Sequence, residues 1–166
     1  KLAVFATPDG DAELGYDYLH VIPPQRAPDV IRQSGLSWAD KWTDQGWVEV
    51  DKHTLRHLRY PDIFALGDVA GVPKGKTAAS VKWQVVEDHL VAAIEGREGS
   101  ALYNGYTSCP LITRVGRAML VEFDYSNNLT PSFPGVIAPL EELWISWLMK
   151  EVALKATYNA MLRGKA

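Results

Sequence analysis

Cysteine is almost absent from this 166-residue chain, which contains Cys109 alone. A single thiol excludes an internal disulfide and any metal cluster built from several cysteines of this chain. Uninterrupted apolar runs of about 18 residues are also missing, so we expect no membrane-spanning helix. The net charge of −3 creates no strongly positive surface. We therefore expect no nucleic-acid partner.

Spacing typical of metal ligands is equally scarce. His53 and His57 are four residues apart, but they flank a polar stretch without a nearby third ligand. We therefore interpret them as solvated surface residues and predict no metal site. The chain starts at Lys1 without a methionine or a leader-like segment. This start suggests an internal position in a longer protein and leaves the compartment open.

What the chain does contain is typical of one globular domain, with 47% apolar and 22% charged residues. The patterns predict an α+β fold. Apolar stretches at 2–6 and 14–22 around a turn at 7–11 indicate a hairpin. The other predicted elements are a short helix at 29–34, strands at 47–51 and 63–67, a helix at 77–95, a loop at 103–110 and two strands within 111–125.

The C-terminal segment has two polar stripes, and their register changes near residue 150. We therefore predict two helices that break within 150–154, each with a broad apolar face. Four basic residues against one acidic residue in 150–166, beside tryptophan-rich apolar faces, suit a membrane interface. Packing of both helices on the protein's own core is the more common alternative.

The segment YPDIFALGD at residues 60–68 is the most informative motif. It reads as a short buried strand followed by Gly67, Asp68 and a glycine- and proline-containing loop. Glycine at a strand end lets a ligand approach the backbone, and the carboxylate can accept hydrogen bonds from hydroxyl groups. The helix predicted after Lys76 and Thr77 would present unpaired N–H groups to an anion. Without further context, an ordinary turn residue is an equally good interpretation of Asp68, and a solvated loop lysine is the better interpretation of Lys76.

Cys109 lies in the sequence YTSCP, which we expect to form a loop. A lone cysteine is most often a small buried apolar residue. A polar loop could instead expose the thiol for redox or nucleophilic chemistry.

Taken together, these motifs resemble the sulfide:quinone oxidoreductases, in particular the branch that includes the mitochondrial enzyme. The residues FALGD at 64–68 resemble the second flavin-binding motif of two-dinucleotide-domain flavoproteins. The more specific resemblance is carried by YNGYTSCPLIT at 103–113. It is supported by LHVIPP at 19–24, GWVEVD at 46–51, EFDY at 122–125 and NAMLRG at 159–164.

The resemblance implies an enzyme in which a cysteine pair beside FAD accepts sulfide and electrons pass to a membrane quinone. Cys109 matches one cysteine of that pair. Asp68 matches the residue that holds the flavin's ribityl chain, Gly67 belongs to the same cofactor-binding motif, and Lys76 and Thr77 match the helix start near the flavin ring. The C-terminal helices match the region that attaches to membranes and frames the quinone entrance. Candidates for quinone contact are Phe123, Tyr125, Trp144 and Trp147.

Two features that the family needs are not in this sequence: a G-x-G-x-x-G turn and a second cysteine. We therefore expect the C-terminal part of a two-domain flavoprotein. Residues 1–45 would be a remnant of the central domain, 46–129 the last flavin-domain segment, and 130–166 the membrane-facing helices. The N-terminal half would be the missing partner. By itself, the chain would lack FAD and activity and would form a homodimer through exposed apolar surfaces.

Two alternatives stay open. The chain could be a non-catalytic module that dimerises or docks on membranes without flavin. It could also belong to an enzyme like type II NADH dehydrogenase, which shares the Gly-Asp motif but has no need of the YTSCP segment.

Overall fold

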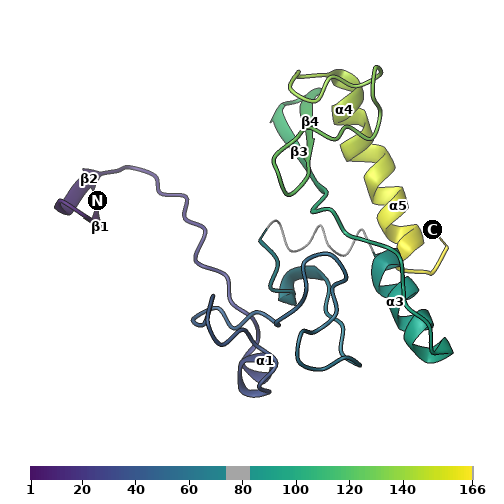
Figure 1. Cartoon of the computed structure of the whole chain (residues 1–166). Helices are drawn as coiled ribbons and strands as arrows, with labels where there is room; N and C mark the ends of the chain where they lie inside the picture. Colours follow the sequence, from purple (N-terminus) through teal and green to yellow (C-terminus); the bar gives the residue numbers. More distant parts are fainter. Residues whose placement is uncertain (74–82, 166) are drawn as a thin grey trace.

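The computed structural model describes residues 1–73 and 83–165. The two parts together contain helices and two antiparallel pairs of strands, which confirms the predicted α+β fold (Figure 1). The elements in chain order are β1 (Leu2–Thr7), β2 (Gly10–Gly15), α1 (Asp29–Gln33), the 3-10 turn η1 (Gly67–Val69), α3 (Trp83–Glu95), β3 (Thr107–Arg114), β4 (Arg117–Phe123), α4 (Trp144–Leu148), the π-helical turn η2 (Met149–Ala153) and α5 (Leu154–Met161).

The N-terminal hairpin of β1 and β2 is confirmed, although its second strand is shorter than predicted. Thr7 pairs with Gly10, so the turn consists of two residues, and β2 ends at Gly15 instead of residue 22. Gly15 is paired with Leu2, the first residue of β1, so β1 has no further residue to pair with the segment after Gly15. The following segment is extended, and it separates the hairpin from the other elements (Figure 1). The short helix predicted at 29–34 is confirmed as α1.

The core of the molecule forms around residues 46–73, yet this region contains little regular structure. Its buried apolar residues are Val48, Val50, Leu55, Ala65, Ala70, Val72, Val85 and Tyr103. The predicted strands at 47–51 and 63–67 are wrong: Val48, Val50 and Phe64 make only single-residue bridges. The paired segments diverge after one residue and do not continue as strands. At Leu55, for example, the backbone has a φ of 59°, which is incompatible with an extended strand. The strand-like apolar pattern of these two segments therefore reflects the burial of their side chains and not regular strand pairing.

His57 belongs to this core, which corrects its assignment to the solvated surface. Its side chain is buried, and its Nδ1 accepts hydrogen bonds from the N–H groups of Arg59 and Tyr60. The proton must therefore lie on Nε2, which donates to the carbonyl of Leu36 at 3.0 Å. His53 bonds through Nδ1 to the carbonyl oxygen of Tyr103. Both rings are satisfied by backbone groups and tie distant segments together.

Helix α3 ends where the sequence predicted. Gly96 has a φ of 70°, a left-handed conformation that suits the residue after a helix. Asp88 on the helix accepts hydrogen bonds from the N–H groups of Ser100 and Ala101, which holds the chain that leaves the helix. The predicted start of this helix, including Lys76 and Thr77, lies outside the described residues.

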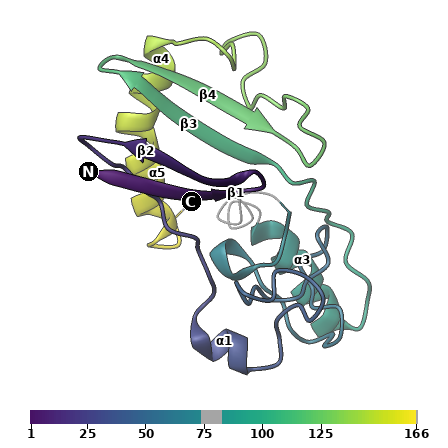
Figure 2. The same cartoon turned by 90° about the vertical axis from the view of Figure 1, so that its left-hand side faces the viewer.

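Strands β3 and β4 form the second hairpin, which lies beside the C-terminal helix (Figure 2). The two strands turn at Gly116, which has a φ of 77°, and this pair confirms the two strands predicted within 111–125. Strand β3 begins at Thr107, so the prediction of a loop over 103–110 is wrong for its last four residues. A bridge between Ala118 and Leu143 fixes the start of α4 against β4.

The C-terminal segment is one continuous helical run instead of two helices. Its α4 and α5 parts are joined by η2, in which hydrogen bonds reach five residues along the chain. A π turn adds a residue to one turn of the helix. Because of this extra residue, the change in polar register near residue 150 needs no break in the helix.

Candidate functional site

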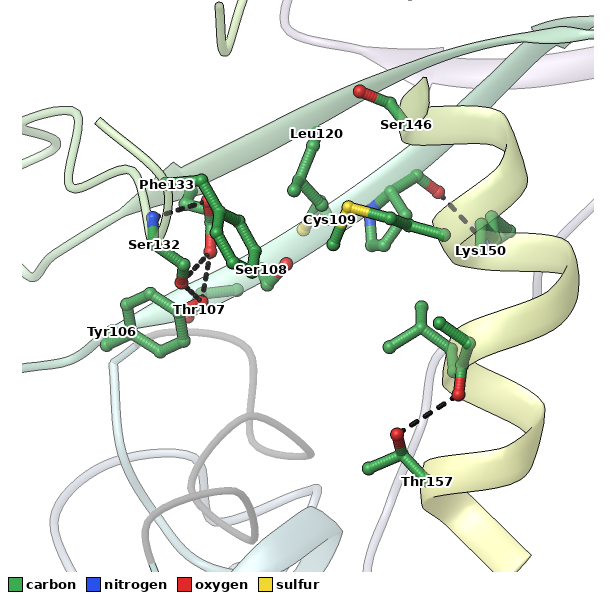
Figure 3. Close-up of a pocket in the computed structure, with 15 residues that line it drawn as sticks. Tyr106, Thr107, Ser108, Cys109, Leu120, Ser132, Phe133, Ser146, Lys150 and Thr157 are labelled. Atoms are coloured by element: carbon green, nitrogen blue, oxygen red, sulfur yellow. Dashed lines mark hydrogen bonds between the residues drawn. The ribbon is translucent and has the colours of Figure 1, made fainter. Parts of the chain in front are cut away.

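A cavity of about 660 Å³ lies between the β3–β4 hairpin and the C-terminal helix (Figure 3). Strand residues line one side and helix residues the other, with the loop at 132–133 closing a third. The lining residues are Tyr106, Thr107, Ser108, Cys109, Pro110, Leu120, Glu122, Ser132, Phe133, Ser146, Met149, Lys150, Ala153, Leu154 and Thr157. Most of the lining atoms are apolar. A ligand would therefore be oriented by the few polar groups in the lining.

Cys109 occupies the third position of β3 and is exposed to solvent. It is paired with Val121 of β4, and successive side chains in a strand point to opposite faces. Cys109 therefore shares a face with Leu111 and Val121, while Pro110 shares the other with Leu120. A thiol in a strand has less conformational freedom than one in a loop. The structure thus leaves Cys109 accessible, which was one of the two interpretations left open by the sequence, but places it on a strand instead of in a loop.

Glu122 is the most unusual residue of the cavity because its carboxylate is buried, with 2% of the residue exposed. The Tyr106 hydroxyl donates a hydrogen bond to Oε1. The Ser132 N–H donates to Oε2 at 2.9 Å, and the Ser132 hydroxyl donates to Oε1. Burial raises the pKa of Tyr106, and the hydrogen bond to Glu122 raises it further. The network fastens the 130–133 loop to the hairpin.

Two polar groups reach the cavity from the helix. Lys150, in the π turn, donates from Nζ to the carbonyl of Pro110 at 3.1 Å. Ser146 is 2% exposed, and its Oγ has no hydrogen-bond partner among the described residues. A buried hydroxyl without a partner costs free energy, so it favours an occupant that can form a hydrogen bond.

Gly67 and Asp68 lie elsewhere, as the first two residues of η1. Gly67 has a φ of 75°, a left-handed conformation that favours glycine. Asp68 is exposed and lines a separate cavity of about 530 Å³. That cavity is also lined by Trp47, Val69 and residues of the 25–31 segment. The described residues thus place Asp68 and Cys109 in two cavities, and the chain by itself does not join them in one site.

The aromatic residues considered for quinone contact do not line the cavity beside Cys109. Tyr125 packs edge-on against Tyr103 and His53, and its hydroxyl donates to the carbonyl of Lys52. Burial raises the pKa of Tyr125 strongly, followed by repulsion from Tyr103 and Asp51. Trp144 is exposed on α4.

Sequence reasoning missed Tyr106, Glu122, Ser132 and Lys150 as site residues. Burial alternates along β4, and the face that contains Glu122 is the more buried one. Apolar residues occupy both faces of β4, so the pattern did not distinguish them. Tyr106 and Ser132 bury the carboxylate from 16 and 10 residues away.

Neither a metal site nor a membrane span emerges from the described part of the chain. Within residues 1–73 and 83–165, no three His, Cys, Asp or Glu side chains come together to hold a metal ion. Within the same ranges, no helix is long and apolar enough to cross a membrane.

Comparison with known proteins confirms the resemblance suggested by the motifs. The mitochondrial sulfide:quinone oxidoreductase of Mus musculus is 38% identical over 98% of this chain. The Dictyostelium discoideum enzyme of the same name is 38% identical over 99% of the chain, and the Schizosaccharomyces pombe enzyme is 40% identical over 73%. The matches cover 36%, 36% and 26% of these three relatives. No family model matches the chain.

The fold also has a counterpart among solved structures. A chain in the cryo-EM structure of the Tetrahymena thermophila mitochondrial ATP synthase, an F1Fo composite tetramer, matches 99% of this chain with a TM-score of 0.76. The identity is 23%, and the match covers 39% of that chain. This likeness concerns the fold alone. On the sequence comparisons, the chain belongs to the sulfide:quinone oxidoreductase family and spans about a third of the length of its curated relatives.

Proposed function

We propose that this chain is the C-terminal, cysteine-bearing part of an enzyme that oxidises sulfide and delivers the electrons to a membrane quinone. The observation that supports this best is the exposed thiol of Cys109 on a strand that borders a large cavity. In the domain organisation that we propose, residues 46–129 complete a flavin domain and 130–166 face the membrane.

The role of Cys109 follows from sulfur chemistry. Hydrosulfide attacks a disulfide between two cysteines, which forms a persulfide on one sulfur and releases the other as a thiolate. The chain has one cysteine, so the second must come from the part of the enzyme that this chain does not span. The face shared by Cys109, Leu111 and Val121 is available for packing against that part, because Cys109 and Leu111 are exposed.

The residues at η1 provide part of a binding site that suits FAD. Gly67 has no side chain, so a ligand can approach its backbone closely. The carboxylate of Asp68 is exposed beside a cavity and can accept hydrogen bonds from the hydroxyl groups of a ribityl chain. When bound, FAD would supply the two-electron transfer between sulfur and quinone. Lys76 and Thr77, proposed to lie near the ring, are outside the described residues. The chain alone offers no phosphate cradle in its sequence, so we expect FAD to be held only with the N-terminal half.

The C-terminal helix supports attachment to a membrane surface. Its apolar residues Leu154, Tyr158, Met161 and Leu162 are exposed, as is Trp144. An apolar helix face flanked by lysine and arginine suits the interface of a bilayer that contains anionic lipids. In the absence of a membrane or the N-terminal half, a second copy of the chain could cover the same surface, which is the basis for the proposed homodimer.

A full-length enzyme that contains this chain tests the role of Cys109. Cys109→Ser should abolish sulfide-dependent quinone reduction and leave the flavin absorbance unchanged, because the hydroxyl cannot form a persulfide. Normal turnover in this variant would remove Cys109 from the mechanism.

A visible spectrum of the purified chain distinguishes this proposal from the module alternative. We expect a colourless chain that gains a flavin band only when it is combined with the N-terminal half. A chain that stays colourless in that combination would favour a non-catalytic module. Sedimentation with vesicles of anionic phospholipid, compared with neutral vesicles, tests the membrane surface.

A further inference from the structure

The segment at 69–71, directly after Asp68, is attached to the core by a residue that is distant in the sequence. The N–H of Val48 donates to the carbonyl of Val69 at 2.9 Å, and the N–H of Gly71 donates to the carbonyl of Val48 at 2.8 Å. Val48 is 3% exposed, so both bonds form in the interior. They hold the backbone that leaves η1 against the core.

Trp38 contacts the same segment through its side chain. Its Nε1–H donates to the carbonyl of Gly71 at 3.2 Å, across 33 positions of the sequence. A Cβ atom on Gly71 would lie 2.2 Å from Nε1 and 2.5 Å from Cδ1 of this indole. The φ of Gly71 is not left-handed. Close approach of the indole, and not backbone conformation, therefore requires glycine at this position.

The indole of Trp38 is itself held by its neighbours. The Nζ atom of Lys41 lies 3.5 Å from the centroid of the ring, and the ring of Trp42 packs edge-on at 6.1 Å between centroids. Trp42 has a φ of 51°, a left-handed conformation that is unusual for a bulky side chain. Such strain persists where the surrounding contacts impose it, and it is frequent near functional sites. The turn at 41–42 thus supports the ring that contacts Gly71.

We propose that Trp38 is a positioning residue for the flavin site: its indole N–H orders the 69–71 segment and thereby holds Asp68 at the cavity beside η1. The residues that line this cavity include Asp68 and Val69 but not Trp38. Trp38 would therefore act on a ligand through the backbone between Gly71 and Asp68. A carboxylate on backbone that is already ordered binds a ligand more tightly, because less conformational entropy is lost on binding.

This inference deepens the proposed function and rests on it, because it assumes that Asp68 binds FAD. The effect on the 69–71 segment can nevertheless be measured in the chain without flavin. Trp38→Phe keeps an aromatic ring and removes the N–H donor. We expect the amide of Gly71 to exchange with deuterium about fivefold faster in this variant, as measured by NMR.

The effect on the cofactor is measured in a full-length enzyme that contains this chain, by titration of the flavin-free protein with FAD and detection of flavin fluorescence. Trp38→Phe should raise the dissociation constant of FAD about fivefold. At saturating FAD the kcat should be unchanged, because Trp38 is not among the residues that line the cavity beside Cys109. Lys41→Met is the matched control: it removes the cation over the same ring but keeps the indole N–H, so FAD should bind almost as tightly as before.

A double-mutant cycle with Asp68→Asn separates positioning from a general structural role. If Trp38 acts through Asp68, Trp38→Phe should weaken FAD binding little further once Asp68 is replaced. Circular dichroism verifies that each variant is folded. An unchanged dissociation constant in Trp38→Phe would overturn the proposal, as would an equal rise in Lys41→Met or full additivity with Asp68→Asn.

The same titration distinguishes this proposal from the function on which it rests. Unchanged FAD binding in Asp68→Asn would contradict the assignment of Asp68 to the flavin. Faster exchange of the Gly71 amide in Trp38→Phe would then still support the contact between Trp38 and the 69–71 segment.

Discussion

The region at 46–73 and the region at 107–161 combine burial and regular structure in opposite ways. Val50, Leu55 and Val72 of the first region are 2% exposed or less, yet they lie outside regular strands. The second region forms a hairpin and a helical run, yet Leu111, Trp144 and Tyr158 are each more than half exposed. Stability is therefore expected to reside in the irregular region, and surfaces for ligands and partners in the regular one.

The first way to break this comparison is to truncate one leucine in each region. Leu55→Ala should lower the free energy of unfolding by about 2–5 kcal/mol, because Leu55 is fully buried in the core. Leu111→Ala should change it by less than about 0.5 kcal/mol, because the side chain is 57% exposed. Urea unfolding measures both. Similar losses in the two variants would contradict the division between the regions.

A second prediction concerns the junction of the regions, where Gly105 has a φ of 83°. A Cβ atom there would lie 2.2 Å from Cγ of Tyr125, so Gly105→Ala should cost about 2–4 kcal/mol. Gly116→Ala is the control: its φ is 77°, but the nearest atom is 3.9 Å away, so only backbone strain of about 1 kcal/mol remains. Thermal unfolding of both variants separates the steric contact from the backbone effect.

Glu122 sharpens the comparison, because it is a buried carboxylate in the region where many apolar side chains are exposed. Glu122→Gln should destabilise the chain by about 1–3 kcal/mol, since the amide cannot accept all three hydrogen bonds. Glu142→Gln, at an exposed ion pair with Arg114, should cost less than about 1 kcal/mol. Equal effects would mean that the network does not hold the loop at 130–133.

The smallest predicted effect is a pH dependence in the irregular region. Burial raises the pKa of Asp51, but hydrogen bonds from Thr54 and His53 outweigh this and lower it below 3.8. The folded state therefore binds the proton less tightly than the unfolded state. The resulting stability is present above pH 3.8 and is lost as pH falls through the folded value. Asp51→Ala should cost about 1 kcal/mol at pH 7, and the difference should shrink in acid. Urea unfolding at pH 7 and pH 3 measures it.

Much of the fold could be predicted from local patterns. The hairpin turns, the end of α3 at Gly96 and the α+β class depend on neighbouring residues, and these predictions are confirmed. The strands at 47–51 and 63–67 could not be judged in this way, because a buried irregular segment shows the same apolar alternation as a strand. The solvated interpretation of His57 was wrong because its three backbone partners include Leu36, 21 residues away.

The sequence by itself determined the family, the single thiol and the glycine positions, because each of these is a property of residue identity or of one backbone position. Only the tertiary structure decided that Cys109 lies on a strand, that Glu122 is buried and that Lys150 reaches Pro110. These features depend on contacts between residues 10 to 40 positions apart. Such contacts form when the hairpin and the helix pack together, and no local pattern specifies them.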